Sequence, residues 1–236
     1  FKIISTPMTL GIMQPYFMPY IGYWQLMAAV DTYVVYDDVN YIKGGWVSRN
    51  NILLNGQKHM FTITLNGASP NKLFNEITIK DDFKKFSRLI EFAYRKAPYY
   101  AEVSALLNKI YNYGDKSLGA FMMNSFQVVL DYLEIDTKLI LSSTITKDNS
   151  LRGKDKVKHI CHLLGADTYY NAIGGQELYD KNDFRADGIA LHFVQSNLTP
   201  YAQLGNEFVP GLSMIDVLMF NSPTEVKQLL TNYKLV

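Results

Sequence analysis

The segment from Met8 to Tyr36 constrains the fold more strongly than any other part of the 236-residue chain. It begins with a short apolar run over 8–13, passes through a polar and aromatic loop into a helical pattern over 20–30, and ends in the β-rich run 32–36. A strand, a helix and a second strand within about 30 residues are typical of a βαβ unit, whose crossover is right-handed. The segment therefore predicts two neighbouring parallel strands joined by a helix.

The rest of the chain continues this alternation of strands and helices. Apolar and β-branched runs predict strands over 58–65, 75–79, 138–141, 167–171 and 189–194, the first two forming a hairpin at the sheet edge. Helical spacing predicts helices over 154–164, 176–179, 214–220 and 224–233, and a block of three helices over 81–136. We therefore expect one α/β domain spanning 1–236, with a Rossmann-like, mostly parallel sheet and a helical subdomain inserted at 81–136.

The composition argues against two classes of partner. Hydrophobic residues make up 48% of the chain, which is enough to bury a full core. The formal net charge is +1, so no global field draws the chain to nucleic acid or to a membrane surface. No apolar run approaches the roughly 20 residues that span a bilayer. We expect no nucleic-acid partner and no membrane span.

Cysteine usage and the amino end predict a cytoplasmic protein. Cys161 is the only cysteine, which excludes an intrachain disulfide framework and a cysteine-based zinc site. The first residues, FKIISTPMTLGIM, lack the basic region, the long apolar core and the cleavage signature of a signal peptide.

Unusual polar and glycine-rich residues gather in the loops that follow the predicted strands. These loops cover 14–23, 37–50, 142–156 and 171–179. In an open parallel sheet, ligands bind outside the carboxyl ends of the strands, near the point where the strand order reverses. The sequence therefore predicts that the four loops form one site.

The first loop precedes a helix whose amino end favours an anion such as phosphate or carboxylate. Pro15 and Pro19 restrict the backbone of this irregular loop. The alternative is that its aromatic side chains only cover the end of the sheet. The candidate ligand contacts here are Gln14, Tyr16, Tyr20, Gly22 and Tyr23.

The second loop combines acids and bases. Asp37 and Asp38 directly follow a strand, and side chains alternate there, so only one of the two is expected to face the site. Lys43 and Arg49 supply cations beside Asn50, and a guanidinium can hold phosphate or carboxylate through two hydrogen bonds. The alternative is a set of salt bridges that stabilises a long loop.

Two further segments carry weaker signals. Lys154 belongs to a basic cluster at a helix start, where cations are disfavoured by the dipole, so the cluster indicates an anionic ligand or a solvated face. The other cluster members are Arg152, Lys156 and Lys158. Gly174 and Gly175 allow close backbone approach or form an ordinary turn.

Metal and cofactor signals are weak. His159 and His162 lie three residues apart on a helix, but no second ligand pair has suitable spacing, so we predict no metal site. No P-loop, G-x-S-x-G or G-x-G-x-x-G motif is present, and the cofactor stays unknown.

Five distinct segments, spaced in order along nearly the whole chain, carry a resemblance to a known family. They read MQPYFMPYIGYWQLM, DTYVVYDDVNYIKGGWVSRNNIL, GADTYYNAIGG, TPYAQ and LSMIDVLMFN. In these segments the chain resembles the WbqC-like protein family, and the first two motifs are specific. The resemblance implies a bacterial protein of O-antigen or other surface-polysaccharide gene clusters that modifies or assembles sugars, as a transferase. Departures from the family pattern occur at Gly44, where a basic residue is usual, and at Asn171-Ala172, where Ser-Gly is common.

Carried over motif by motif, the resemblance implies functional roles for residues in all of these segments. They are Gln14, Tyr16, Tyr20, Gly22, Asp37, Asp38, Tyr41, Lys43, Arg49, Asn50, Gly174, Gly175, Tyr179, Tyr201, Gln203 and Asp216.

A second resemblance concerns mechanism. The run Tyr20-Ile21-Gly22-Tyr23 looks like the H-x-G-H region of nucleotidyltransferases, with both histidines replaced by tyrosine. A tyrosine hydroxyl can hydrogen-bond a phosphate but supplies no cation near neutral pH. A degenerate nucleotidyltransferase-like protein is therefore one alternative.

The leading hypothesis is a group-transfer enzyme that acts on a sugar or on an anionic small molecule such as a sugar nucleotide. In it, Lys43 and Arg49 hold the anion, and Asp37 or Asp38 orients a hydroxyl or acts as the base, with Tyr20 as a further catalytic candidate. There are two alternatives: a non-catalytic module that binds a nucleotide sugar or glycan, and a purely structural partner.

Overall fold

Five parallel strands and one antiparallel edge strand form the central sheet of the computed structural model, which describes residues 7–205 and 207–236. The prediction about the amino end therefore lies partly outside the described residues. The sheet order is β10-β9-β8-β1-β2-β7. The bounds are β1 Thr9–Met13, β2 Thr32–Val35, β7 Lys138–Leu141, β8 Thr168–Ala172, β9 Ala190–Ser196 and β10 Tyr233–Leu235.

The strand order reverses once. From β1 the chain builds outward through β2 to β7, and it then returns to place β8 on the other side of β1, followed by β9. All of these neighbours are parallel, and β10 pairs antiparallel with β9. This topology confirms the predicted Rossmann-like α/β class, and it puts the reversal between β1 and β8.

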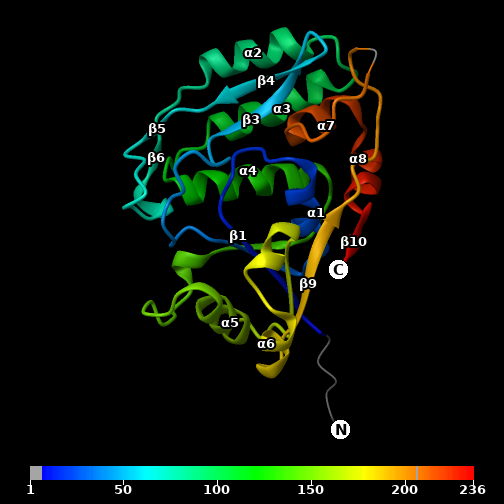
Figure 1. Cartoon of the computed structure of the whole chain (residues 1–236). Coiled ribbons are helices and arrows are strands. Elements are labelled where there is room, and N and C mark those ends of the chain that lie inside the picture. Colours follow the sequence, from blue (N-terminus) through cyan, green and yellow to red (C-terminus); the bar gives the residue numbers. More distant parts are fainter. Residues whose placement is uncertain (1–6, 206) are drawn as a thin grey trace.

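Successive side chains along the strands point to opposite faces of the sheet and pack into two separate cores. Leu10, Ile12 and Val34 pack with helix α5 (Gly153–Leu163) and helix α6 (Lys181–Ala186). Tyr33 and Val35 point to the other face, toward α1 (Ile21–Ala29) and α4 (Leu118–Tyr132). In Figure 1, α5 and α6 lie on the opposite side of β1 from α4.

The three helices expected over 81–136 are present. They are α2 (Lys84–Tyr94), α3 (Tyr100–Tyr111) and α4 (Leu118–Tyr132). Helix α3 packs on α4 and on α7 (Met214–Phe220), while α2 contacts β3 (Arg49–Leu54). Helix α4 also packs on β7, so it covers the central sheet.

The predicted hairpin between 58–65 and 75–79 forms only at one end, where Leu65 pairs with Ile79, and most of its first strand pairs elsewhere. Strand β4 (Gln57–Thr62) pairs antiparallel with β3, inside a segment partly expected to be a loop. The turn is Asn55-Gly56, with φ values of 50° and 74°, and two successive residues of positive φ match the twist of a tight hairpin. Strands β5 (Leu65–Asn66) and β6 (Thr78–Ile79) form only a two-residue ladder.

Smaller differences concern the last third of the chain. The helix expected over 224–233 ends earlier, as α8 (Pro223–Leu230), and the chain then forms edge strand β10. Sequence periodicity missed α6, whose first turn is capped by Asp180. Three short 3-10 turns complete the fold: η1 (Phe74–Glu76), η2 (Ser142–Thr144) and η3 (Ile173–Glu177). Within the described ranges, no helix has both the length and the apolar character to cross a membrane.

Candidate functional site

A cavity of 330 Å³ lies at the point where the strand order reverses. Met13 at the end of β1, Ala172 at the end of β8 and Val194 in β9 form its base. We name this cavity the switch-point pocket. It occupies the position where parallel α/β sheets bind ligands, because the crossovers leave β1 and β8 in opposite directions and open a crevice between their ends.

Aromatic side chains form the walls of the switch-point pocket. The rings of Tyr16 and Tyr23 lie 5.5 Å apart, and Trp46, which is partly exposed, comes from the second loop. The Tyr20 ring folds back over Gly22, where a Cβ would lie 2.5 Å from the ring atoms. Gly22 therefore makes room for a tyrosine at the pocket wall.

Tyr20, Gly22 and Tyr23 lie at the amino end of α1, so the segment compared with H-x-G-H faces the pocket. The Tyr20 side chain is 38% exposed, and partial burial raises the pKa of its hydroxyl. At neutral pH this hydroxyl is a neutral donor and acceptor.

Beside the aromatic side chains with their hydroxyl and indole groups, the polar side chains of the pocket are two amides and one ammonium. Asn50 accepts a hydrogen bond from the Asn51 backbone N–H at 2.7 Å and donates to the Met18 carbonyl at 3.4 Å. Lys58 of β4 is the one charged lining residue within the described chain. A wall of aromatic rings and amides with a single cation suits a ligand that is rich in hydroxyl groups or rings and carries its anionic group near that cation.

Hydrogen bonds hold the proline-rich loop in place. The Tyr23 hydroxyl donates to the Gln14 carbonyl at 2.5 Å, and the Tyr16 hydroxyl donates to Gln14 Oε1 at 3.2 Å. Trp24 Nε1 donates to the Pro19 carbonyl at 3.1 Å. Gln14, a predicted ligand contact, therefore orients two tyrosines of the pocket.

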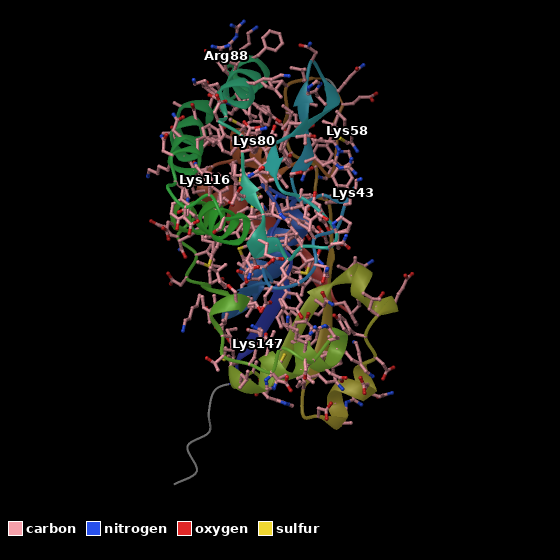
Figure 2. The ribbon with its side chains drawn as sticks, turned by 90° about the vertical axis from the view of Figure 1, so that its left-hand side faces the viewer. Lys43, Lys58, Lys80, Arg88, Lys116 and Lys147 are labelled. Carbon is pink, nitrogen blue, oxygen red and sulfur yellow. The ribbon has the colours of Figure 1, made fainter. Side chains whose placement is uncertain are left out.

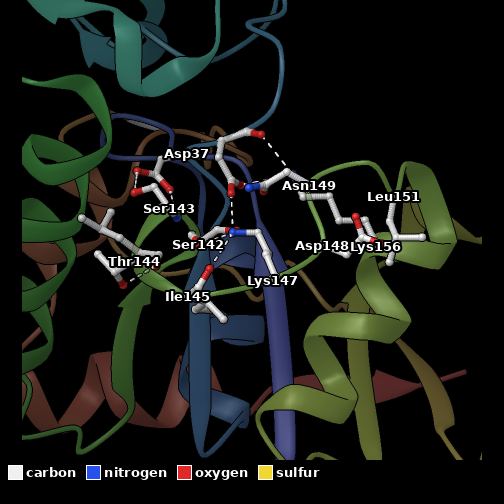
Figure 3. Close-up of polar contacts among 12 residues, drawn as sticks. Asp37, Ser142, Ser143, Thr144, Ile145, Lys147, Asp148, Asn149, Leu151 and Lys156 are labelled. Carbon is white, nitrogen blue, oxygen red and sulfur yellow. Dashed lines mark hydrogen bonds and ion pairs between the residues drawn. The ribbon is translucent and has the colours of Figure 1, made fainter.

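Asp37 faces α4 and is buried. Its carboxylate accepts hydrogen bonds from the Ser143 backbone N–H at 2.8 Å and from Ser143 Oγ at 2.6 Å, as Figure 3 shows. Burial raises the pKa of Asp37, and the two bonds from Ser143 oppose that change. This carboxylate joins the ends of β2 and β7.

Asp38 faces the opposite side of the sheet, toward α5. Its carboxylate lies 2.5 Å from Lys147 Nζ and 3.4 Å from Lys156 Nζ. Burial raises the pKa of Asp38, but the close contact with Lys147 and the charges of both lysines outweigh it and lower the pKa overall. The two aspartates thus lie on different faces, as alternation at a strand end requires.

The cations of the second loop do not converge on the pocket. Arg49 donates to the carbonyls of Gly44 and Gly45, and its guanidinium lies 5.5 Å from the Trp46 ring centre. Arg49 therefore packs against Trp46 and helps to position this wall of the pocket. Lys43 is exposed, and Figure 2 shows Lys43 and Lys58 on one side of the molecule, well separated from Lys147.

Several other predicted contacts have structural partners. Lys154 Nζ lies 3.0 Å from Asp183, Tyr41 packs edge-on against Phe74, and Tyr179 packs against Tyr169 and Phe184. A Cβ at Gly175 would lie 2.4 Å from Asn171 Nδ2, whereas Gly174 is open.

Asp216 is the centre of a buried polar cluster. It accepts hydrogen bonds from the hydroxyls of Tyr94 at 2.8 Å and Tyr201 at 2.6 Å, and from Gln203 Nε2 at 2.8 Å. Burial raises the pKa of Asp216 against the effect of these donors. Tyr201 and Gln203 therefore tie the loop before α7 to the core.

Comparison with known proteins finds similarity over most of the chain. The model of the WbqC-like protein family matches residues 14–228, which include both the proline-rich loop and Asp216. The chain belongs to the WbqC-like protein family. It is also 27% identical to uncharacterized protein Rv1507c of Mycobacterium tuberculosis, over 91% of this chain and 94% of that protein. No solved structure matches it significantly.

The pocket of this WbqC-like chain contains residues that sequence reasoning missed. Asn51 and Lys58 lie at strand positions that look unremarkable in the sequence. The Asn55-Gly56 turn is the visible signal for Lys58, because it predicts the hairpin that brings β4 beside the proline-rich loop.

The structure also defines the local chemistry of the metal and thiol candidates. Among residues 7–205 and 207–236, no group of three histidine, cysteine or acidic side chains could hold a metal ion. Cys161 is buried on α5, and burial raises the pKa of its thiol to about 12. A protonated, enclosed thiol is a poor nucleophile.

Proposed function

We propose that this WbqC-like protein binds a sugar or a sugar nucleotide in the switch-point pocket and transfers a group to or from it during bacterial surface-polysaccharide biosynthesis. The observation that carries the proposal is the convergence of Tyr16, Tyr20 and Trp46 with Asn50 and Asn51 on one cavity at the reversal point of the sheet. Sequence segments far apart supply these side chains, and the family match covers all of them.

The chemistry of the walls fits such a ligand. An aromatic ring can stack on the apolar face of a sugar or on a nucleobase, while amides donate to and accept from hydroxyl groups. Tyr20 is the candidate for contact with the reacting group, because its hydroxyl is partly exposed at the amino end of α1. An anionic group placed there is favoured by the helix dipole and by Lys58.

One feature favours a second function, a binding module without catalysis. No carboxylate, histidine or cysteine lines the pocket within the part of the chain that the structure describes. Asp37 and Asp38, the acids first considered as bases, hold Ser143 and the two lysines. Group transfer in the pocket would then depend on the tyrosine hydroxyls and on a reactive donor.

A binding screen followed by a turnover assay separates these functions. Uridine, thymidine and guanosine diphosphate sugars are screened for an increase in the melting temperature, and any ligand found is then incubated with simple sugar and amine acceptors. An enzyme releases the nucleotide, and Tyr20→Phe lowers kcat while the ligand still binds. A module binds without release, and the absence of stabilisation both by every nucleotide sugar and by the simple sugars alone would refute both functions.

A further inference from the structure

A second cavity, of 500 Å³, lies between the end of β2 and the beginning of α5. Tyr36, Asp38 and Asn40 line it from the strand side, and Arg152 and Lys156 line it from the helix side. We name it the cationic cavity. Tyr36 and Asp38 point to the α5 face of the sheet, whereas the switch-point pocket is built on the α1 face.

Two buried lysines share a single carboxylate beside this cavity. The side chains of Lys147 and Lys156 are only 2% and 6% exposed, and both pair with Asp38. Lys147 also donates to the carbonyls of Ser142 and Ile145, which Figure 3 shows. The carbonyls accept hydrogen bonds from the lysine ammonium groups but do not neutralise their charge. Two ammonium groups against one carboxylate leave one positive charge in excess, and burying an unpaired charge is unfavourable.

Part of this excess is offset locally. Lys156 Nζ donates to the Asp38 carbonyl at 3.0 Å and lies 5.2 Å from the centre of the Tyr36 ring. A cation over an aromatic face is stabilised, but less than a cation paired with an anion. The ammonium of Lys156 therefore lines the cavity as a cation that a second anion would stabilise.

Arg152 adds a third cation at the mouth of the cavity. Its Nη1 donates to the carbonyls of Asn149 and Leu151, and the side chain is otherwise exposed. Since a guanidinium has five N–H donors, several stay available for a ligand. Asp148 and Asp155, the nearest acids along the chain, are exposed and do not line the cavity.

The backbone at this point is also open to a ligand. Helix α5 begins at Gly153, and no side chain caps it among the residues that the structure describes. Gly153 has a φ of 52°, and a Cβ there would meet nothing within 4 Å. The first N–H groups of an 11-residue helix thus border a cavity that already holds a buried, incompletely neutralised lysine.

We propose that the cationic cavity is a phosphate site that takes the phosphoryl group of a phosphate ester, held by Lys156, Arg152 and the first turn of α5. Its net charge, from Lys147, Lys156 and Arg152 against Asp38, is positive, and its walls present the Tyr36 hydroxyl as a further donor. The site is separate from the switch-point pocket and does not depend on the function proposed for that pocket.

Isothermal titration calorimetry with three probes tests the site: inorganic phosphate, glucose 1-phosphate and uridine diphosphate. The decisive variant is Arg152→Glu, and the matched control is Arg88→Glu, which makes the same charge change at an exposed position of α2. Figure 2 shows Arg88 far from Lys147. Both positions are exposed, so both variants are expected to fold, which circular dichroism verifies.

We expect at least one phosphate ester to bind the wild type and Arg88→Glu equally, and Arg152→Glu to bind about tenfold more weakly or worse. Arg152→Lys should recover part of the affinity because it restores the charge without the planar fork. The probe that binds most tightly identifies the chemical class of the ligand, which is phosphate alone, a sugar phosphate or a nucleotide. Equal binding by Arg152→Glu and Arg88→Glu, or no binding of any probe to the wild type at about 10 mM, would overturn the proposal.

Discussion

Alanine at two helical glycines should have opposite effects on stability, because the two glycines contact different kinds of neighbour. A Cβ at Gly119 of α4 would lie 2.6 Å from the Cβ of Asp37, at the base of a buried side chain. A Cβ at Gly22 of α1 would lie 2.5 Å from the outer atoms of the Tyr20 ring. The first neighbour is fixed, whereas the second can rotate.

The expected magnitudes follow from this difference. In Gly119→Ala, α4 must move away from Asp37, whose carboxylate is held by two hydrogen bonds from Ser143. Overpacking of this kind costs about 1–3 kcal/mol. Replacing glycine by alanine within a helix gains about 1 kcal/mol. The net expectation is a loss of up to about 2 kcal/mol.

In Gly22→Ala the Tyr20 ring, which is 38% exposed, can swing out toward solvent. The gain in helix propensity of up to about 1 kcal/mol is then kept, so the free energy of unfolding should be unchanged or higher. Ligand affinity should fall instead, because the ring leaves the wall of the switch-point pocket.

Urea unfolding followed by circular dichroism measures both variants against the wild type. A lower midpoint at an unchanged slope is expected for Gly119→Ala, and an equal or higher midpoint for Gly22→Ala. If Gly119→Ala were as stable as the wild type, the close contact between α4 and Asp37 would be incorrect.

Three further predictions concern buried polar groups. Asp216→Ala should lower the free energy of unfolding by about 3–5 kcal/mol, because three donors lose their acceptor, and a loss below about 1 kcal/mol in urea unfolding would contradict that role. Lys147→Met should lose about 2 kcal/mol at pH 7 in urea unfolding, less than the loss of a sole partner, because Asp38 keeps its longer contact with Lys156. The pKa of Asp38 is lowered in the folded state, so the stability that its pairing contributes is present above the usual aspartate pKa and is lost as the pH falls through the folded value. If the difference in free energy of unfolding between Lys147→Met and the wild type grew below about pH 4, the pairing would be contradicted. Cys161 should react with a thiol reagent at pH 8 only in urea, because the folded thiol is buried and its pKa is raised to about 12; rapid labelling of the native protein would contradict its burial.

The class of fold could be predicted because its signals are local. The central strands β1 and β2 are largely buried, so each reads as a short apolar or β-branched run, and the alternation of strands with helices identifies the class. Strand order has no such local signal, since the return of the chain to β8 beside β1 depends on long-range packing. The hairpin of β3 and β4 did have a local signal, because Asn55-Gly56 is a typical tight-turn sequence. The prediction of a loop over 37–50 covered the beginning of β3 and obscured this signal.

The candidate site was only partly predictable for a similar reason. Tyr16 in the loop before α1 and Tyr23 in the first turn of α1 line the switch-point pocket because this one helix positions them both. Asp37 and Asp38 looked like one acidic pair, but strand alternation sends them to opposite faces, where Ser143 and two lysines engage them. The partner Lys147 lies more than a hundred residues along the chain, so no spacing rule could connect it to Asp38.

The central claim, that the switch-point pocket is the binding site, is tested most directly by filling it. Ala172→Phe places a ring at the base of the cavity, and Ala190→Phe makes the same change at the exposed amino end of β9. Calorimetric titration with the nucleotide sugar that most stabilises the wild type should give equal affinity for Ala190→Phe and at least about tenfold weaker binding for Ala172→Phe. Unchanged affinity in a folded Ala172→Phe protein would contradict the claim.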